Sequence, residues 1–281
     1  MKTFAVLALS LSLTLLSLPG LCAAQAFKGK NVPDDKSRLK AQRLWEQAIA
    51  AKGGRERLYA VSNFVVSSKS SFGLSPRPDV MAGVKEENLY VLPGKWWSFS
   101  DYRPGKMGYS IDVLDFERST WWHTSPGKKV PLSPRPEVRQ DVFNNFKERF
   151  RQAQFIYLME TQWVKPTIVG ARTEREGLRK MDVVETLIDG VRVDFYLDRQ
   201  THLPRKIATD FPGVRTGGKM DYTCRLDDYV EINGLRMPQK VDCLDKNNRT
   251  AYQFNVPYNA AIFEHPPTPD MSAEAWKISA R

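Results

Sequence analysis

Two cysteines, Cys224 and Cys243, have the spacing that most directly predicts chemistry in this sequence. Between them lies Asn233-Gly234, a dipeptide that favours a two-residue type I′ hairpin because both of its residues tolerate positive φ. If the chain turns there, Ile232 faces Leu235, and counting back along both strands brings Cys224 opposite Cys243. The register therefore predicts a disulfide between the strands, formed in an oxidising compartment. Two buried free thiols are the alternative.

The other reactive side chains form no catalytic or metal-binding pattern in the sequence. The histidines are too widely separated for a metal motif, and adjacent carboxylates on a strand point to opposite faces. These residues are His123, His202 and His265, and the pairs Glu86-Glu87 and Asp227-Asp228. We therefore expect no catalytic residue, no metal and no cofactor. The chain is interpreted as a non-enzyme, and a hydrolase is the least supported alternative.

Aromatic side chains are the more informative group. Trp97 and Phe99 alternate on one expected strand, Trp121 lies on another, and Phe146 and Phe150 have helical spacing. Ordinary core packing accounts for any one of them. Together they predict the walls of an apolar ligand site.

The elements that would position these residues are helices and many short strands. Helices are expected at 37–52 and 136–162, with a short turn at 56–59; Asp34 and Asp35 cap the first helix and Gly53-Gly54 end it. The strands are expected at 63–72, 85–92, 95–102, 110–114, 120–124, 168–172, 180–188, 191–197, 205–210, 220–232, 235–244 and 249–256. So many antiparallel strands must curl. The prediction is an α+β fold: a large curved antiparallel sheet, or incomplete β-barrel, with helices covering its concave face over an apolar trough.

The first 26 residues read as a signal peptide cleaved near Ala26. Lys2 precedes an apolar run from Phe4 to Leu18, and Ala24-Gln25-Ala26 gives the small-x-small cleavage pattern. A buried core helix is the alternative reading of the run. Leu21 before Cys22 is a poor match to a lipoprotein signal, so no lipid anchor is expected. The protein is expected in the periplasm.

The remaining chain divides into three expected parts. Residues 27–36 form a flexible segment, 37–266 one domain, and 267–281 a loose C-terminal tail. The formal net charge of the whole chain is +10. Outside the cytoplasm this charge favours a membrane surface or a lipid-bearing partner and argues against nucleic acid, although a merely basic soluble protein would have it too.

Several motifs, taken in order, resemble those of the LolA/LolB-like superfamily, the outer-membrane lipoprotein-sorting proteins. They are Ala51-Lys52-Gly53-Gly54, the strand end at 90–95, the turn at 196–204, the Asp228-Tyr229 hairpin through Pro238, and the segment from Asn255 to Phe263. The resemblance is clearest over 180–265 and thinnest over 104–165. It implies an incomplete barrel that holds acyl chains against its apolar concave face.

Two functions follow as expectations. The first is a monomeric periplasmic carrier or binding protein for lipoproteins or other acyl lipids, with Trp97, Phe99, Trp121, Phe146 and Phe150 as walls of the trough. A transport partner in the inner or outer membrane would accompany it. The alternative is an envelope sensor or regulatory module of the same fold, which would contact a protein partner through the cationic second helix.

Overall fold

A computed structural model describes residues 34–72, 83–103, 108–125, 136–212, 219–243, 246–268 and 271–278. The expected signal peptide lies outside these residues. The described residues belong to one compact unit, Pro33–Arg281.

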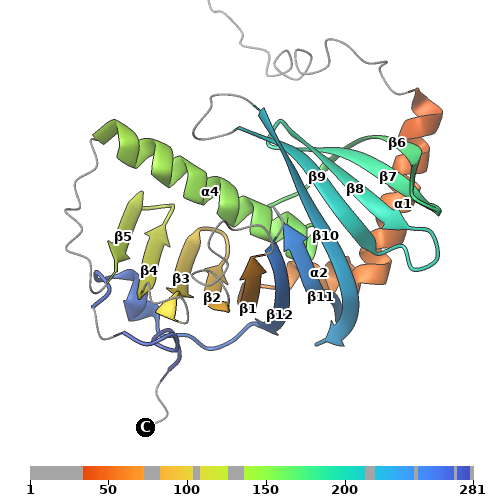
Figure 1. Ribbon diagram of the computed structural model, residues 1–281. Coiled ribbons are helices and arrows are strands. Elements are labelled where there is room, and N and C mark those ends of the chain that lie inside the picture. The colour runs from red at the N-terminus through yellow and green to blue at the C-terminus, as the bar shows by residue number, and fades with distance from the viewer. Residues whose placement is uncertain are drawn as a thin grey trace, which may run out of the picture. The chain divides into compact units, whose positions relative to one another are not determined.

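One twelve-stranded antiparallel sheet organises this unit (Figure 1). The strands are β1 (Asn63–Phe72), β2 (Val84–Val91), β3 (Lys95–Asp101), β4 (Tyr109–Asp115), β5 (Thr120–Thr124), β6 (Thr167–Glu176), β7 (Arg179–Ile188), β8 (Val191–Asp198), β9 (Pro204–Pro212), β10 (Lys219–Ile232), β11 (Leu235–Cys243) and β12 (Lys246–Phe254). Their order is β5-β4-β3-β2-β1-β12-β11-β10-β9-β8-β7-β6, so β5 and β6 are the two edges of a sheet that is not closed. The predicted α+β fold with a curved, open antiparallel sheet is confirmed.

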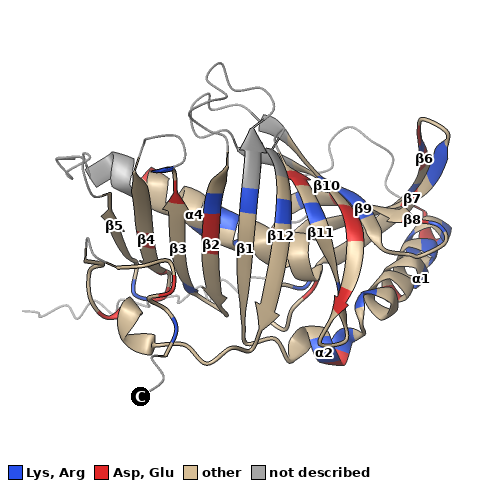
Figure 2. Ribbon diagram, turned by 60° about the horizontal axis from the view of Figure 1, so that its bottom comes forward, with Lys and Arg blue, Asp and Glu red and all other residues tan. Residues whose placement is uncertain are grey.

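This topology forces the helix α4 (Pro136–Leu158) to cross the sheet, because α4 joins one edge strand, β5, to the other, β6. Its 23 residues span roughly 35 Å at 1.5 Å per residue. Twelve flat strands at about 4.8 Å spacing would span more than that. The sheet curves around the helix, and α4 runs along one face of it (Figures 1 and 2).

The same face also carries α1 (Asp35–Lys52) and α2 (Arg55–Tyr59). The Asp34 carboxylate caps α1 by accepting a hydrogen bond from the Ser37 backbone N–H at 2.7 Å. Gly53 ends the helix with φ of 129°, and a Cβ there would lie 2.3 Å from the carbonyl oxygen of Gly234. Glycine is therefore required where the helix end meets the β10–β11 turn.

The disulfide between Cys224 and Cys243 is present, as predicted. The two residues are directly paired across β10 and β11. The turn residues Asn233 and Gly234 have φ of 51° and 76°, as a type I′ turn requires. A bond of this kind is typical of proteins that fold outside the reducing cytoplasm.

The opposite, outer face of β1–β4 is covered by the C-terminal segment, which includes the short helix η3 (Ala260–Phe263). The expected loose tail is described at 267–268 and 271–278, and it includes a residue that packs against the sheet. Trp276 is only 2% exposed, and its indole N–H donates to Glu87 at 3.1 Å. Burial of one large aromatic ring outweighs the polar composition of the residues around it.

None of the helices that the structure describes is both long enough and apolar enough to cross a lipid bilayer.

Candidate functional site

Aromatic rings from the sheet and from α4 meet on the concave face, and we call this group the aromatic seam. Its rings from the sheet are Tyr90, Trp96 and Trp121, Phe116 comes from the β4–β5 turn, and its α4 rings are Phe143, Phe146 and Phe150. Ring centroids lie 5.0 Å apart for Phe116–Phe150, 5.3 Å for Trp121–Phe146, 5.5 Å for Trp96–Phe146 and for Phe116–Phe143, and 5.9 Å for Tyr90–Phe150. These distances are in the range where aromatic pairs attract.

Burial along α4 is uneven. Towards its C-terminal end, Phe150, Phe155 and Leu158 are 3%, 2% and 0% exposed. Towards its N-terminal end, Phe143 and Phe146 are only half-buried. The N-terminal half of the helix therefore leaves apolar surface partly open to solvent.

Glu160, just after α4, anchors the C-terminal end of the helix. Its carboxylate is 5% exposed and accepts hydrogen bonds from Trp45 Nε1 at 2.8 Å, Arg55 Nε at 2.8 Å and the Tyr59 hydroxyl. Burial by itself raises the pKa of Glu160, but these hydrogen bonds outweigh it and hold the pKa below the ordinary value. The charged carboxylate thus ties α4 to α1 and α2.

Arg151 makes a second anchor. Its guanidinium donates to the Asp189 carboxylate at 3.1 Å and to the Ile188 carbonyl at 3.3 Å, at the β7–β8 turn. It also pairs with Glu148. Of the cations that were expected to form a contact surface on this helix, Lys147 and Arg149 are exposed, whereas Arg151 is committed to the fold.

The five predicted wall residues fall into two clusters on opposite faces of the sheet. Trp121, Phe146 and Phe150 lie in the seam. Trp97 and Phe99 lie on the outer face, packed with Trp276 and the residues of η3. These five residues therefore do not line one trough in this structure.

The strand register explains the division. Trp96 aligns through Leu114 with Trp121, while Trp97 aligns through Val113 with Trp122. Alternate residues of a strand point to opposite faces. Four seam residues were not among the predicted wall residues: Tyr90, Trp96, Phe116 and Phe143. The register of β3, β4 and β5, which links Trp121 through Leu114 to Trp96, would have identified Trp96.

A small polar group borders the seam on β4 and β5. The Asp112 carboxylate accepts a hydrogen bond from Trp121 Nε1 at 3.0 Å and lies 2.8 Å from His123 Nδ1. The hydrogen bond to Asp112 raises the pKa of His123. Among the described residues, no three His, Cys, Asp or Glu side chains converge on a point that could hold a metal ion. What the seam offers a ligand is therefore apolar contact, because the ring N–H of Trp121 is already bonded to Asp112.

No family model matches this chain, and no curated protein does. Among solved structures, the chain is similar to an outer membrane lipoprotein-sorting protein domain from Vibrio parahaemolyticus, with 10% identity, a TM-score of 0.39, and coverage of 81% of this chain and 96% of that one. It is also similar to MucB in complex with MucA(peri), with 12% identity, a TM-score of 0.21 and coverage of 85% and 62%.

The MucA/MucB complex of Pseudomonas aeruginosa gives 12% identity, a TM-score of 0.24 and coverage of 86% of this chain and 64% of that one. The chain thus spans less than two thirds of the MucB-complex chains that it matches. The Vibrio parahaemolyticus domain carries the name of the family that the sequence motifs resemble.

Proposed function

We propose that this protein is a periplasmic carrier or binding protein for lipoproteins or other acyl lipids. In this proposal the acyl chain enters the aromatic seam between the concave face and the N-terminal half of α4. Trp121, Phe146 and Phe150 would form its walls, together with Trp96. The observation that carries the proposal is the half-buried state of Phe143, Phe146 and Trp121, in contrast to the buried Phe150, Phe155 and Leu158 towards the C-terminal end of the helix.

The free energies involved allow an acyl chain to replace the contacts between aromatic rings in the seam. Each ring pair is worth roughly 0.5–1.5 kcal/mol beyond its buried area. Each buried methylene of an acyl chain is worth about 0.8 kcal/mol, so a chain of about fourteen methylenes gains up to roughly 11 kcal/mol. A chain can therefore replace the loose contacts of α4. The anchors at Arg151 and Glu160 would hold the other end of the helix in place.

The compartment is part of the same proposal. The apolar N-terminal run and the Cys224–Cys243 disulfide both support export to an oxidising space. In that space a lipid needs protection from water while it moves between membranes.

The test uses neighbouring tryptophans of β5 that point to opposite faces. Trp121 lies in the seam, whereas Trp122 faces outward, and both are half-buried. Binding of a fluorescent fatty acid is measured by titration. Trp121→Gln should weaken binding by about tenfold, since it removes one to two kcal/mol or so of apolar contact, and Trp122→Gln should leave binding unchanged. No binding by the unaltered protein, or equal losses in both variants, would contradict the proposal.

A protein partner is the second candidate, in an envelope sensor or regulatory module. Lys147 and Arg149 favour it because they are exposed on α4, on the element that a ligand would move. In that case Lys147→Glu with Arg149→Glu should abolish association with an envelope protein and leave fatty-acid binding intact. If the double variant still associates with the envelope protein as the unaltered protein does, the result counts against this candidate.

A further inference from the structure

Three cations stand in one row across the outer face of the sheet. Lys85 on β2 is directly opposite Lys69 on β1, and Lys69 is directly opposite Arg249 on β12. All three side chains are exposed. Figure 2 shows this basic row as blue bands at matching heights on the three strands.

In the described part of the chain, Lys85 has an acidic neighbour in Asp101, whose pKa is lowered by its hydrogen bonds from Arg103 and, less strongly, by the charge of Lys85. The structure gives no ion pair or hydrogen bond to any of the three side chains, while the flanking charges are engaged elsewhere. Asp101, opposite Lys85, has both carboxylate oxygens bonded to Arg103 at 2.8 Å. Lys240, opposite Arg249, lies 3.6 Å from Asp242. Like charges on directly opposed strand positions repel, so the row is unfavourable until an anion joins it.

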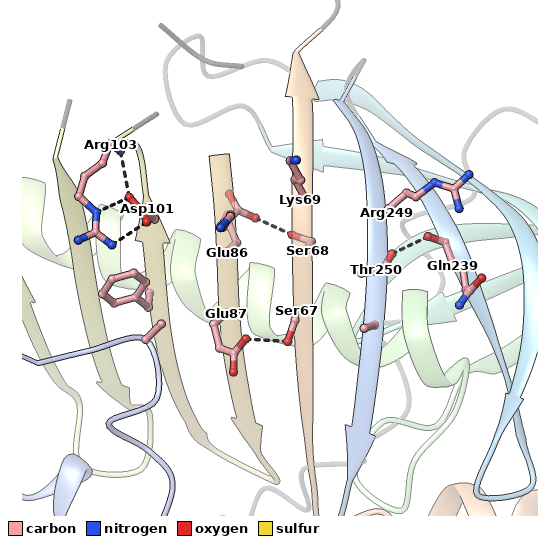
Figure 3. A pocket seen from close by; sticks show the side chains of 14 residues that line it. Ser67, Ser68, Lys69, Glu86, Glu87, Asp101, Arg103, Gln239, Arg249 and Thr250 are labelled. Carbon is pink, nitrogen blue, oxygen red and sulfur yellow. Dashed lines mark hydrogen bonds and ion pairs between the residues drawn. The ribbon is translucent and has the colours of Figure 1, made fainter. Parts of the chain in front are cut away.

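A cavity of about 610 Å³ lies against this row (Figure 3). Lys69, Lys85 and Arg249 line it together with Phe99 and Ala273. The cavity has the size of a small-molecule site. Its lining also includes three carboxylates, each with a hydrogen-bond partner: Glu86 with Ser68, Glu87 with Ser67 and Asp101 with Arg103. Ala273 belongs to the C-terminal segment, so the packing of Trp276 completes the wall.

The Glu87 carboxylate, which also lines the cavity, is already hydrogen-bonded. Glu87 accepts a hydrogen bond from the Ser67 hydroxyl at 2.6 Å and another from Trp276 Nε1 at 3.1 Å. Figure 3 shows Ser67 and Glu87 below Lys69 on neighbouring strands. The Glu87 carboxylate therefore secures the cavity wall and forms no ion pair with the three cations.

We propose that this pocket binds a phosphate group borne by a molecule with a small apolar part. Arg249 presents a planar fork of donors that matches phosphate oxygens, and Lys69 and Lys85 add point charges from the adjacent strands. Phe99 and Ala273 contact the apolar part. The site lies on the face opposite the aromatic seam, so it stands or falls independently of the acyl-binding proposal.

The first experiment neutralises the row. Lys69→Gln, Lys85→Gln and Arg249→Gln are combined in one variant, and the matched control combines Arg175→Gln, Arg179→Gln and Lys180→Gln. The control removes the same charge from the exposed β6–β7 hairpin. Calorimetric titration uses inorganic phosphate and glycerol 3-phosphate. Binding to membranes is measured by sedimentation with two kinds of vesicle. One kind is phosphatidylcholine alone, and in the other one lipid in three is phosphatidylglycerol.

Each lost cation should weaken binding by about tenfold, the effect of losing one charge-assisted hydrogen bond. The control should bind as the unaltered protein does. Binding of the soluble ester identifies a soluble phosphate compound as the source, and binding only to the anionic vesicles identifies a lipid head group. Failure of the unaltered protein to bind either, or equal losses in variant and control, overturns the proposal.

A second experiment needs no substitution. Acylation of lysine side chains is measured by mass spectrometry. The protein is labelled with glycerol 3-phosphate present, with chloride at equal ionic strength as the control, and with anionic vesicles present, with neutral vesicles as the control. Lys69 and Lys85 should be protected severalfold, and Lys180 should not. Equal labelling of all three lysines under every condition overturns the proposal even if the triple variant fails to fold.

Discussion

Phe146 on α4 and Trp121 on β5 have ring centroids 5.3 Å apart, yet both side chains are only half-buried. Phe155, nine residues further along the same helix, is 2% exposed and packs edge-on against Phe195. The C-terminal end of the helix is therefore tightly packed, whereas its N-terminal end packs only loosely against the sheet. Any opening of the seam should begin at the N-terminal end of α4.

Phe146→Ala tests this order of opening. Truncating a fully buried phenylalanine costs about 3–5 kcal/mol, so the half-buried Phe146 should cost about 1–2 kcal/mol of unfolding free energy. Hydrogen exchange should accelerate in the first turns of α4 and stay unchanged around Phe155. Phe155→Ala is the control and should destabilise the whole domain. If hydrogen exchange were accelerated equally along all of α4 in the Phe146 variant, the helix would not open from its N-terminal end, and the prediction would be contradicted.

The disulfide gives a second prediction. Cys224 and Cys243 are separated by 19 residues in sequence, and closing a loop of that size stabilises the folded state by roughly 3 kcal/mol. Cys224→Ala combined with Cys243→Ala should lower the unfolding free energy by about that amount in urea titrations. The unaltered protein in reductant should match the variant. Alkylation of two thiols in denatured, unreduced protein would show that the bond is absent.

Local signals predicted most of this fold. Alternating strands separated by turn residues gave all twelve strands to within a few residues, and the Asn233-Gly234 turn was enough to set the register that pairs the cysteines. Such features depend on residues close in sequence. Asp34 and Gly53 likewise mark the two ends of α1 through backbone hydrogen bonding and positive φ.

What the sequence did not predict depends on long-range packing. Trp97 and Trp121 look equivalent as aromatic strand residues, but the strand register assigns them to opposite faces. Trp276 lies in a polar segment whose burial depends on contacts with β2, almost two hundred residues earlier. The location of the aromatic seam likewise depends on α4 joining the two sheet edges, a property of strand order rather than of local pattern.

Lys52 carries the third prediction. Its side chain is 1% exposed, its ammonium lies 5.4 Å from the Tyr229 ring centroid, and burial lowers its pKa from 10.5 to about 7. The unfolded chain therefore holds this proton more tightly than the folded protein, so the charge opposes folding at low pH. The penalty is complete below about pH 7 and fades as the pH rises towards 10.5.

Lys52→Met should accordingly raise the unfolding free energy, by a few kcal/mol below pH 7 and by much less near pH 10. Urea titrations across this range measure the difference. Lys36→Met, at an exposed position of the same helix, is the matched control and should change little at any pH. A gain for the Lys52 variant that does not vary with pH would show that the lysine does not titrate as its burial implies.

Glu160 gives the fourth prediction, at the other end of α4. Despite the opposing effect of burial, hydrogen bonds from Arg55, Tyr59 and Trp45 hold its pKa below the ordinary 4.5. The folded protein therefore holds this proton less tightly than the unfolded chain. The stability that this provides is present above pH 4.5 and is lost as the pH falls through the lowered value.

Glu160→Gln should cost about 1–3 kcal/mol at neutral pH, because it removes charge-assisted hydrogen bonds from a buried acceptor. The loss should shrink in acid, where the unaltered protein gives up the same interactions. Glu46→Gln removes the other carboxylate on Arg55, which lies 2.9 Å away and is 60% exposed, and should cost less than about 1 kcal/mol. Equal losses in the two variants at neutral pH would show that Arg55, rather than the buried carboxylate, holds the end of α4. With Glu160 neutralised, faster hydrogen exchange should reach the last turn of the helix, which the Phe146 variant leaves closed.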